Sequence, residues 1–212
     1  MSRHIALFLA FVAGFTDTIT FVQAGLFSSH VTGNFVVFAA ALGRGVGADD
    51  WLKLIAFPVS VFGVILATFA HDRLGCAPRL LLAVEAAVLL AIGAIGLVPL
   101  PFQTKAWLMM GLVVAMGWQN AGHRLYPPFG PLSGAMTNNI IQATIALWRH
   151  FLPAPASFPE VIGLALWRVI ACFALGCALS VFVMHAVGLG AVVVPALLLA
   201  FLVARWEAQP HG

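Results

Sequence analysis

The sequence predicts an all-α polytopic membrane protein built from two homologous halves. Only 8% of its 212 residues are charged and 62% are hydrophobic, whereas a soluble domain has about 25% charged residues. Long apolar runs alternate with short polar stretches, and the second half repeats the order of long and short runs found in the first. The chain is therefore expected to form a single integral membrane domain over residues 1–212.

Eight apolar runs define the expected helices. They fall at 5–25, 34–43, 52–70, 80–100, 105–121, 135–148, 161–184 and 187–204. Six of them approach or exceed the ~17–25 residues that cross ~30 Å of hydrocarbon, and these are expected to be long transmembrane helices. The runs at 34–43 and 135–148 are shorter and are expected to be interrupted segments, either half-spanning or re-entrant. If they also span, the chain crosses the membrane eight times.

Residues 1–100 and 101–212 read as an internal repeat. Two alignments, at shifts of about 103 to 113 residues, pair amino acids of the same type in the same order. The pairs are Gly14 with Gly117, Asp17 with Asn120, Thr32 with Thr137, Asn34 with Asn139, Gly63 with Gly176, and Gly75 with Gly188. Each half then has the order long, short, long, long. Repeated halves in membrane proteins commonly form transporters, with the binding site where the halves meet.

The basic residues favour a cytoplasmic N-terminus in an inner (plasma) membrane. With six or with eight crossings, seven Lys and Arg residues fall on the N-terminal side and three on the other. Charge therefore does not choose between inverted repeats, with three full crossings per half, and parallel repeats, with four. The inverted arrangement explains why the two short segments are short.

Asp17 lies near the middle of the first run, where a charge costs about 2.5–3.5 kcal/mol. One interpretation is a proton or cation site, or a carboxylate that binds a polar solute. The other is a structural pair with the segment around Thr32–Asn34 or with a basic partner. The repeat partner Asn120 cannot titrate, so a site formed by the two would be asymmetric.

A polar junction marks the start of each short run. The residues of these junctions are Thr32, Gly33 and Asn34 in the first half and Thr137, Asn138 and Asn139 in the second. Such residues favour helix N-termini, where backbone N–H groups are free to bind an electronegative atom. Either two helix N-termini converge on a polar solute, or the residues are ordinary caps near the membrane surface. His30 adjoins the first junction and is a candidate gate or proton relay.

Other chemistry has little support in the sequence. Glu85 lies about six residues past Arg79, ~9 Å along a helix, so a structural role near the lipid headgroups is expected. The chain has no HExxH, no GxSxG and no metal-like cluster, which argues against an enzyme, a metal and a cofactor. The scattered basic residues do not suggest nucleic-acid binding.

Two stretches resemble a known family. The segment AGFTDTITFVQAGLFSSHVTGN (13–34) is similar to the N-terminal signature of the YoaK-like proteins, an uncharacterised family of bacterial multi-spanning membrane proteins. The matching residues are Ala13, Gly14, Asp17, Ser29, His30, Thr32, Gly33 and Asn34. GWQNA (117–121) is similar to the family's G-x-Q-N-A stretch, whereas Thr137–Asn138 departs from its second T-G motif. The resemblance implies a multi-spanning inner-membrane protein and supplies no function.

The expected function is a small transporter or channel-like permease for a small polar solute or ion. The expected substrate-binding residues are Asp17, His30, Thr32, Gly33, Asn34, Gln119, Asn120, Thr137, Asn138 and Asn139. The alternative is a membrane scaffold or sensor that transports nothing and packs against another protein. The expected partners are the lipid bilayer and the solute. The solute pathway could lie within one chain or between two copies of it, and both alternatives stay open.

Overall fold

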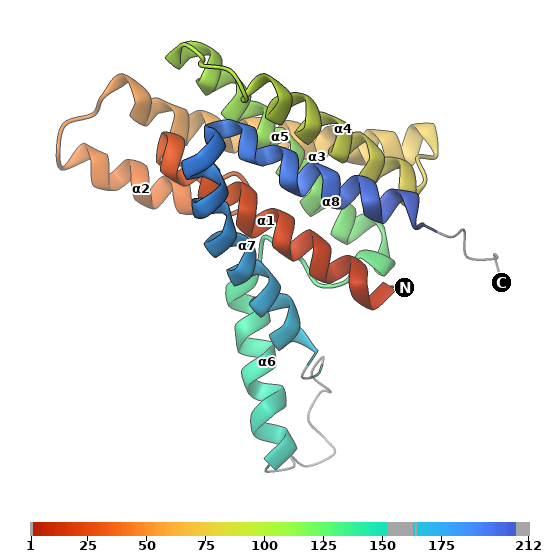
Figure 1. The fold of residues 1–212 in the computed structure, drawn as a ribbon. Helices are drawn as coiled ribbons and strands as arrows, with labels where there is room; N and C mark the ends of the chain where they lie inside the picture. Colours follow the sequence, from red (N-terminus) through yellow and green to blue (C-terminus); the bar gives the residue numbers. More distant parts are fainter. Residues whose placement is uncertain (1, 152–162, 164, 207–212) are drawn as a thin grey trace.

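The structure is a computed structural model that describes residues 2–151, 163 and 165–206. All regular secondary structure in these residues is helical (Figure 1). The elements are α1 (Ser2–Ala24), α2 (Gly33–Leu42), η1 (Ala48–Asp50), α3 (Trp51–Leu74), α4 (Pro78–Ile95), α5 (Phe102–Leu125), η2 (Pro127–Phe129), α6 (Met136–Phe151), α7 (Leu166–Val187), η3 (Gly188–Val192) and α8 (Val193–Ala204).

The helices follow the predicted apolar runs with one difference. The run at 187–204 is divided into the short helix η3 and α8, which has 12 residues. Gly188, at φ +57°, ends α7, and a Cβ on Gly190 would collide with the Leu97 side chain. The division therefore follows from a turn and a close approach. Part of the predicted run at 161–184 lies outside the described residues.

Within the described residues, four helical stretches are long and apolar enough to cross a membrane. They are His4–Ala24, Ala48–Leu74, Pro78–Ile95 and Leu166–Ala204. α5 has 24 residues but carries Gln119, Asn120, His123 and Arg124 near its end. The outer surface is also apolar, with side chains such as Phe62 and Phe182 more than half exposed. This surface is typical of a protein that faces lipid.

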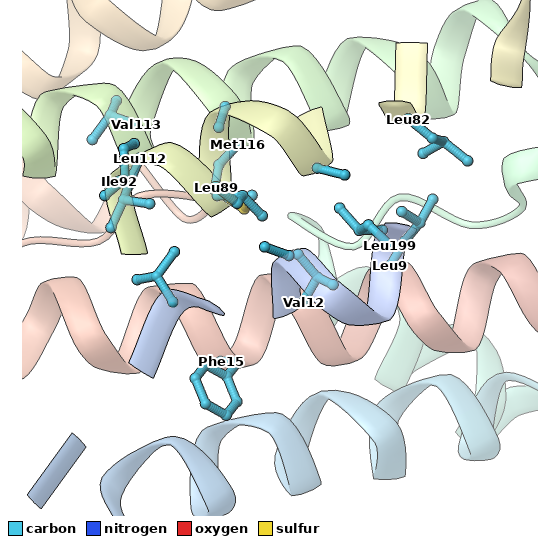
Figure 2. Packing of buried hydrophobic residues seen from close by; sticks show 14 of the residues in the cluster. Leu9, Val12, Phe15, Leu82, Leu89, Ile92, Leu112, Val113, Met116 and Leu199 are labelled. Carbon is cyan, nitrogen blue, oxygen red and sulfur yellow. The ribbon is translucent and has the colours of Figure 1, made fainter. Parts of the chain in front are cut away.

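The core lies where α1, α4, α5 and α8 meet. Figure 2 shows Leu9 of α1, Leu82 and Leu89 of α4, Met116 of α5 and Leu199 of α8 gathered in one cluster. These side chains are fully or almost fully buried. α1 is thereby fixed at the centre of the bundle, where its polar residues are removed from the outer surface.

Two helix pairs approach closely through glycine, and the first joins α1 to α7. A Cβ on Gly14 would overlap the carbonyl oxygen of Phe173, and one on Gly176 would overlap that of Phe11. The second pair joins α3 to α5. There, a Cβ on Gly63 or Gly117 would overlap a carbonyl oxygen of the partner helix. Small residues at such crossings let helix backbones pack together in membranes.

In two further helix pairs, α4 with α8 and α1 with α5, the two helices are antiparallel. The Arg79 Nε donates to the Val203 carbonyl oxygen at 3.2 Å near one end of the α4–α8 pair, and Gly93 packs on Val193 near the other end. α1 and α5 are also antiparallel (Figure 1). Thr16 contacts Met116, whereas Gln119, further along α5, bonds the carbonyl oxygen of Leu9, earlier on α1.

The two short helices lie outside this core. α2 packs along α3, and α6 packs along α7. Figure 1 shows α6 and the first half of α7 extending together away from the rest of the molecule. Each short helix therefore has one main neighbour, and the chain just before each of them turns back into the bundle.

Candidate functional site

The chain re-enters the bundle directly after α1. Gly25, at φ +63°, makes the turn, a backbone conformation that favours glycine. The Phe27 ring then stacks on Phe21 with centroids 4.8 Å apart, and the following residues reach Asp17. Asp17 is seven residues before the end of α1, so this first re-entrant segment (residues 25–32) returns by about 10 Å. α2 begins at that depth and runs back out.

Asp17 holds the tip of the first re-entrant segment. Its side chain is buried, and Oδ1 accepts hydrogen bonds from the backbone N–H groups of Ser28 (2.8 Å) and Ser29 (2.6 Å). The Ser28 hydroxyl donates to the same oxygen at 3.0 Å. These bonds satisfy two backbone donors that would otherwise be buried without partners. Of the two interpretations of Asp17, the contacts of Oδ1 correspond to the structural one.

His30 occupies the other carboxylate oxygen. Its Nδ1 lies 2.5 Å from Asp17 Oδ2, and the edge of its ring meets Phe173 of α7. The His30 side chain is 29% exposed, whereas that of Asp17 is 5% exposed. His30 is therefore the group through which the buried carboxylate is connected to accessible space.

The first polar junction has a different role from an ordinary helix cap. Thr32 occupies the N-cap position of α2 without a side-chain cap bond. Instead, the buried Asn34 closes a ring with Phe27: Oδ1 accepts from the Phe27 N–H at 2.7 Å and Nδ2 donates to the Phe27 carbonyl oxygen at 2.8 Å. Gly33 leaves room for the Phe27 ring. Asn34 and Gly33 therefore shape the segment, whereas the Thr32 side chain is exposed.

A second re-entrant segment (residues 126–135) follows α5 and includes η2. Gly130, at φ +74°, makes its turn, and the buried Ser133 reaches α5. The Ser133 Oγ accepts a bond from Gln119 Nε2 at 2.9 Å and lies 3.1 Å from His123 Nε2. Gln119 also donates to the carbonyl oxygen of Leu9 at 3.1 Å, which ties the segment to α1.

The two re-entrant segments meet at Asn120. Its Nδ2 donates to the carbonyl oxygen of Ser29 in the first segment at 3.3 Å. Asn120 also packs closely on Gly134 of the second segment. A Cβ atom added to Gly134 would lie only 2.8 Å from the Asn120 Oδ1. Asp17 and Asn120, which the sequence alignment pairs, thus both contact the tip of the first segment.

The second polar junction contributes less. Asn139 is buried and donates from Nδ2 to the Leu132 carbonyl oxygen at 3.1 Å. Thr137 and Asn138 are exposed on α6. Of the predicted site residues, Asp17, His30, Thr32 and Asn120 therefore lie in or against the first re-entrant segment. Gln119 instead bonds Leu9 and Ser133. Thr137 and Asn138 lie apart on α6.

A cavity of about 320 Å³ lies beside this junction. His30 and Thr32 of the first segment, Gly134 of the second and Ser60 of α3 contribute to its lining. The remaining lining residues are Ser29, Val31, Phe57, Val61, Val64 and Ile65. Polar groups thus line one side, and mostly apolar side chains of α3 line the other, a combination typical of small-molecule sites.

Ser60 was not among the site residues expected from the sequence. The only sequence signal was a serine in an apolar run, one helical turn before Gly63. Glu85 was expected near the headgroups, but it is buried near the middle of α4. Among the described residues, no three His, Cys, Asp or Glu side chains are grouped to hold a metal ion.

One comparison with known proteins found a match. A family model described as "Protein of unknown function (DUF1275)" matches residues 5–205. No curated protein and no solved structure matches the chain.

Proposed function

Because the chain belongs to the family of proteins of unknown function DUF1275, in agreement with the resemblance read from its sequence, we propose its function from the site itself. The protein is a small transporter or channel-like permease for a small polar solute or ion. Its apolar helices suggest a membrane protein. The solute site is the cavity beside His30, where the two re-entrant segments meet.

The observation that carries this proposal is the bond between Asn120 and Ser29. It brings two broken backbone segments from distant parts of the chain together inside a bundle of apolar helices. Irregular backbone is tolerated at membrane depth only where protein buries it or where it lines a wet cavity. Both segments contribute to the lining of the cavity. A paired, interrupted element at a helix interface is also where transporters bind their solutes.

The proposal includes an inverted repeat of residues 1–100 and 101–212. Under the repeat, α1 corresponds to α5 and α4 to α8, and each of these pairs is antiparallel. Gly25 and Gly130 both have positive φ at the turn of a re-entrant segment. The glycine contact of α1 with α7 corresponds to that of α5 with α3. Each half then has three crossing stretches, which are α1, α3 and α4 in the first half and α5, α7 and η3 continued by α8 in the second. The fourth helix of each half, α2 or α6, follows a re-entrant segment.

His30 is the gating residue in this proposal, and Asp17 positions it. The imidazole connects the carboxylate with the cavity, so a change in its protonation alters the charge that a solute meets. The fixed segment and its polar groups orient the solute. No covalent chemistry, metal or cofactor is required, and we assign no enzymatic activity.

The experiment is solute uptake by liposomes that contain the purified protein. A panel of small polar solutes and ions, with the proton among them, is compared between wild type, H30Q and protein-free liposomes. The control is H71Q, because His71 makes a similar pair with Asp72 at 2.6 Å on an exposed surface. We expect uptake of at least one solute by wild type and H71Q and a loss in H30Q. No uptake of any solute, with all variants folded, would favour the scaffold or sensor.

The location of the protein follows from the same proposal. Inverted repeats place the turn at Gly25 and the loop at 43–50 on the side opposite to the N-terminus. The distribution of Lys and Arg supports a cytoplasmic N-terminus, and the inner membrane is the location that we propose.

A further inference from the structure

Glu85 lies at the centre of the antiparallel pair formed by α4 and α8. It comes six residues after Arg79, which bonds Val203, and eight residues before Gly93, which packs on Val193. It is 1% exposed. Its side chain is therefore enclosed by the packed helices, which its spacing from Arg79 did not reveal.

Both carboxyl oxygens of Glu85 are buried without a hydrogen-bond partner among the described residues. Apolar side chains of the buried core lie along this helix pair. They include Leu82 and Leu89 on α4 itself, Leu9 of α1 and Leu199 of α8 (Figure 2).

The elements packed on α4 place no charged side chain opposite Glu85. η3 and α8 contain none. On α5, Lys105 lies in the first turn, and His123 and Arg124 lie in the last. Both ring nitrogens of His123 have other partners: Nδ1 lies beside the Gly130 carbonyl oxygen and Nε2 beside the Ser133 hydroxyl.

The α1 helix, also part of this core, carries His4, which lines a pocket with Leu198 and Phe201 of α8, and Asp17. His4 lies in its first turn. Asp17 lies further along and is held by the first re-entrant segment. On α4 itself, Arg79 directs its Nε to the end of α8. None of these groups is bonded to the Glu85 carboxyl.

An ionised carboxylate in such surroundings is very costly, because nothing replaces the water that it loses. The neutral acid costs much less, since only a hydroxyl and a carbonyl lose hydrogen bonds. An apolar side chain would be better still for packing, and the equivalent position in the second half of the proposed repeat is Leu198. Helix packing therefore does not require an acid at position 85.

We propose that Glu85 is a proton-binding site in the core of the bundle. In the closed arrangement seen here, the carboxyl group holds its proton as the neutral acid. When α4 separates from its neighbours and water enters, the O–H bond breaks and the proton passes to water, leaving the carboxylate. Intramembrane carboxylates of this kind form proton relays in pumps and transporters. The site is separate from the His30 cavity and gives the protein a means of coupling to a proton gradient.

Infrared spectroscopy of the full chain in liposomes tests this proposal without any transport assay. Wild-type protein at pH 7 is expected to show the carbonyl stretch of a protonated carboxyl group, shifted when glutamate is labelled with ¹³C. The band is expected to disappear in E85Q and to remain in D49N, which removes an exposed acid on η1. Absence of a band that shifts with labelled glutamate would overturn the proposal.

A second variant keeps the result interpretable if E85Q does not fold. The chain has only two other glutamates, Glu160 and Glu207. In the double variant E160Q/E207Q, which retains Glu85, the labelled band is expected to be unchanged, and its loss there would overturn the assignment. Because the readout is spectroscopic, the proton site stands or falls independently of solute uptake at the His30 cavity.

Discussion

Asn34 and Asn139 make the same contact in the two halves of the chain. Each is buried near the start of a short helix and donates from Nδ2 to the carbonyl oxygen of the residue seven positions earlier. The acceptors are Phe27 and Leu132. A shared contact that crosses seven residues, at two positions 105 residues apart, is what a duplicated re-entrant segment would produce.

Removal of the Asn34 side chain is expected to destabilise the protein. N34A leaves the N–H and carbonyl groups of Phe27 without their partners, at a cost of about 2–3 kcal/mol. N139A removes one hydrogen bond to Leu132 and is expected to cost about 1 kcal/mol. Thermal unfolding in detergent measures both.

The matched control is N138A, which alters the same residue type one position away on an exposed face. It is expected to change stability by less than about 0.5 kcal/mol. Equal effects of N138A and N139A would show that the buried bond to Leu132 contributes nothing.

The glycine crossing between α1 and α7 gives a second prediction. G176A places a methyl group on the carbonyl oxygen of Phe11, which is backbone and cannot move aside without separating the helices. A loss of about 1–3 kcal/mol is expected. G111A is the control, because its methyl group meets the tip of the Ile92 side chain, which can turn away. Unfolding temperature and the gel-filtration profile compare the two, and a G176A variant as stable as G111A would contradict the close approach.

A third prediction concerns topology. In the inverted repeat, Val46 in the loop after α2 lies on one side of the membrane, and Leu74 at the end of α3 lies on the same side as the C-terminus. Both side chains are exposed. Cysteines at positions 46 and 74, in a chain without its three native cysteines, are expected to react with an impermeant thiol reagent from opposite sides.

Parallel repeats with eight crossings predict a different pattern. A cysteine at position 46 would then react from the side of the C-terminus, and one at position 74 from the other side. A tag at the C-terminus supplies the reference, so the measurement does not depend on which compartment holds the N-terminus.

Asp17 gives a fourth prediction. D17A removes the acceptor for the Ser28 and Ser29 amides, so the tip of the first re-entrant segment is expected to loosen. Hydrogen exchange of these amides is expected to become faster than in wild type. The control D49A removes an acid on η1 that does not contact this segment. Unchanged exchange at Ser28 and Ser29 in D17A would contradict the anchoring role.

The helices could be predicted from the sequence because their signal is local. Runs of apolar residues gave each helix to within a few residues, and only the division at Gly188 was missed, since it depends on how Gly190 packs against Leu97. The paths of the polar junctions could not be predicted. Asn34 looks like a helix cap in the sequence, but its partner is Phe27, and the position of Phe27 depends on the turn at Gly25.

The lining of the cavity also could not be predicted from the local sequence. Ser60 lines it only because α3 lies beside the first re-entrant segment. The burial of Glu85 could not be predicted for a related reason. Its spacing from Arg79 gave its position along α4, but the carboxyl group is buried because α8 and α5 pack on α4. Residue spacing does not reveal that packing.

Thiol modification inside the cavity shows whether solute passes through it. In a chain without native cysteines, S60C places a thiol among the lining residues, and V88C places one on the exposed face of α4 as the control. We expect a small hydrophilic thiol reagent to block solute uptake by S60C liposomes and to leave uptake by V88C liposomes unchanged. Uptake that continues in fully modified S60C protein would contradict a solute pathway through this cavity.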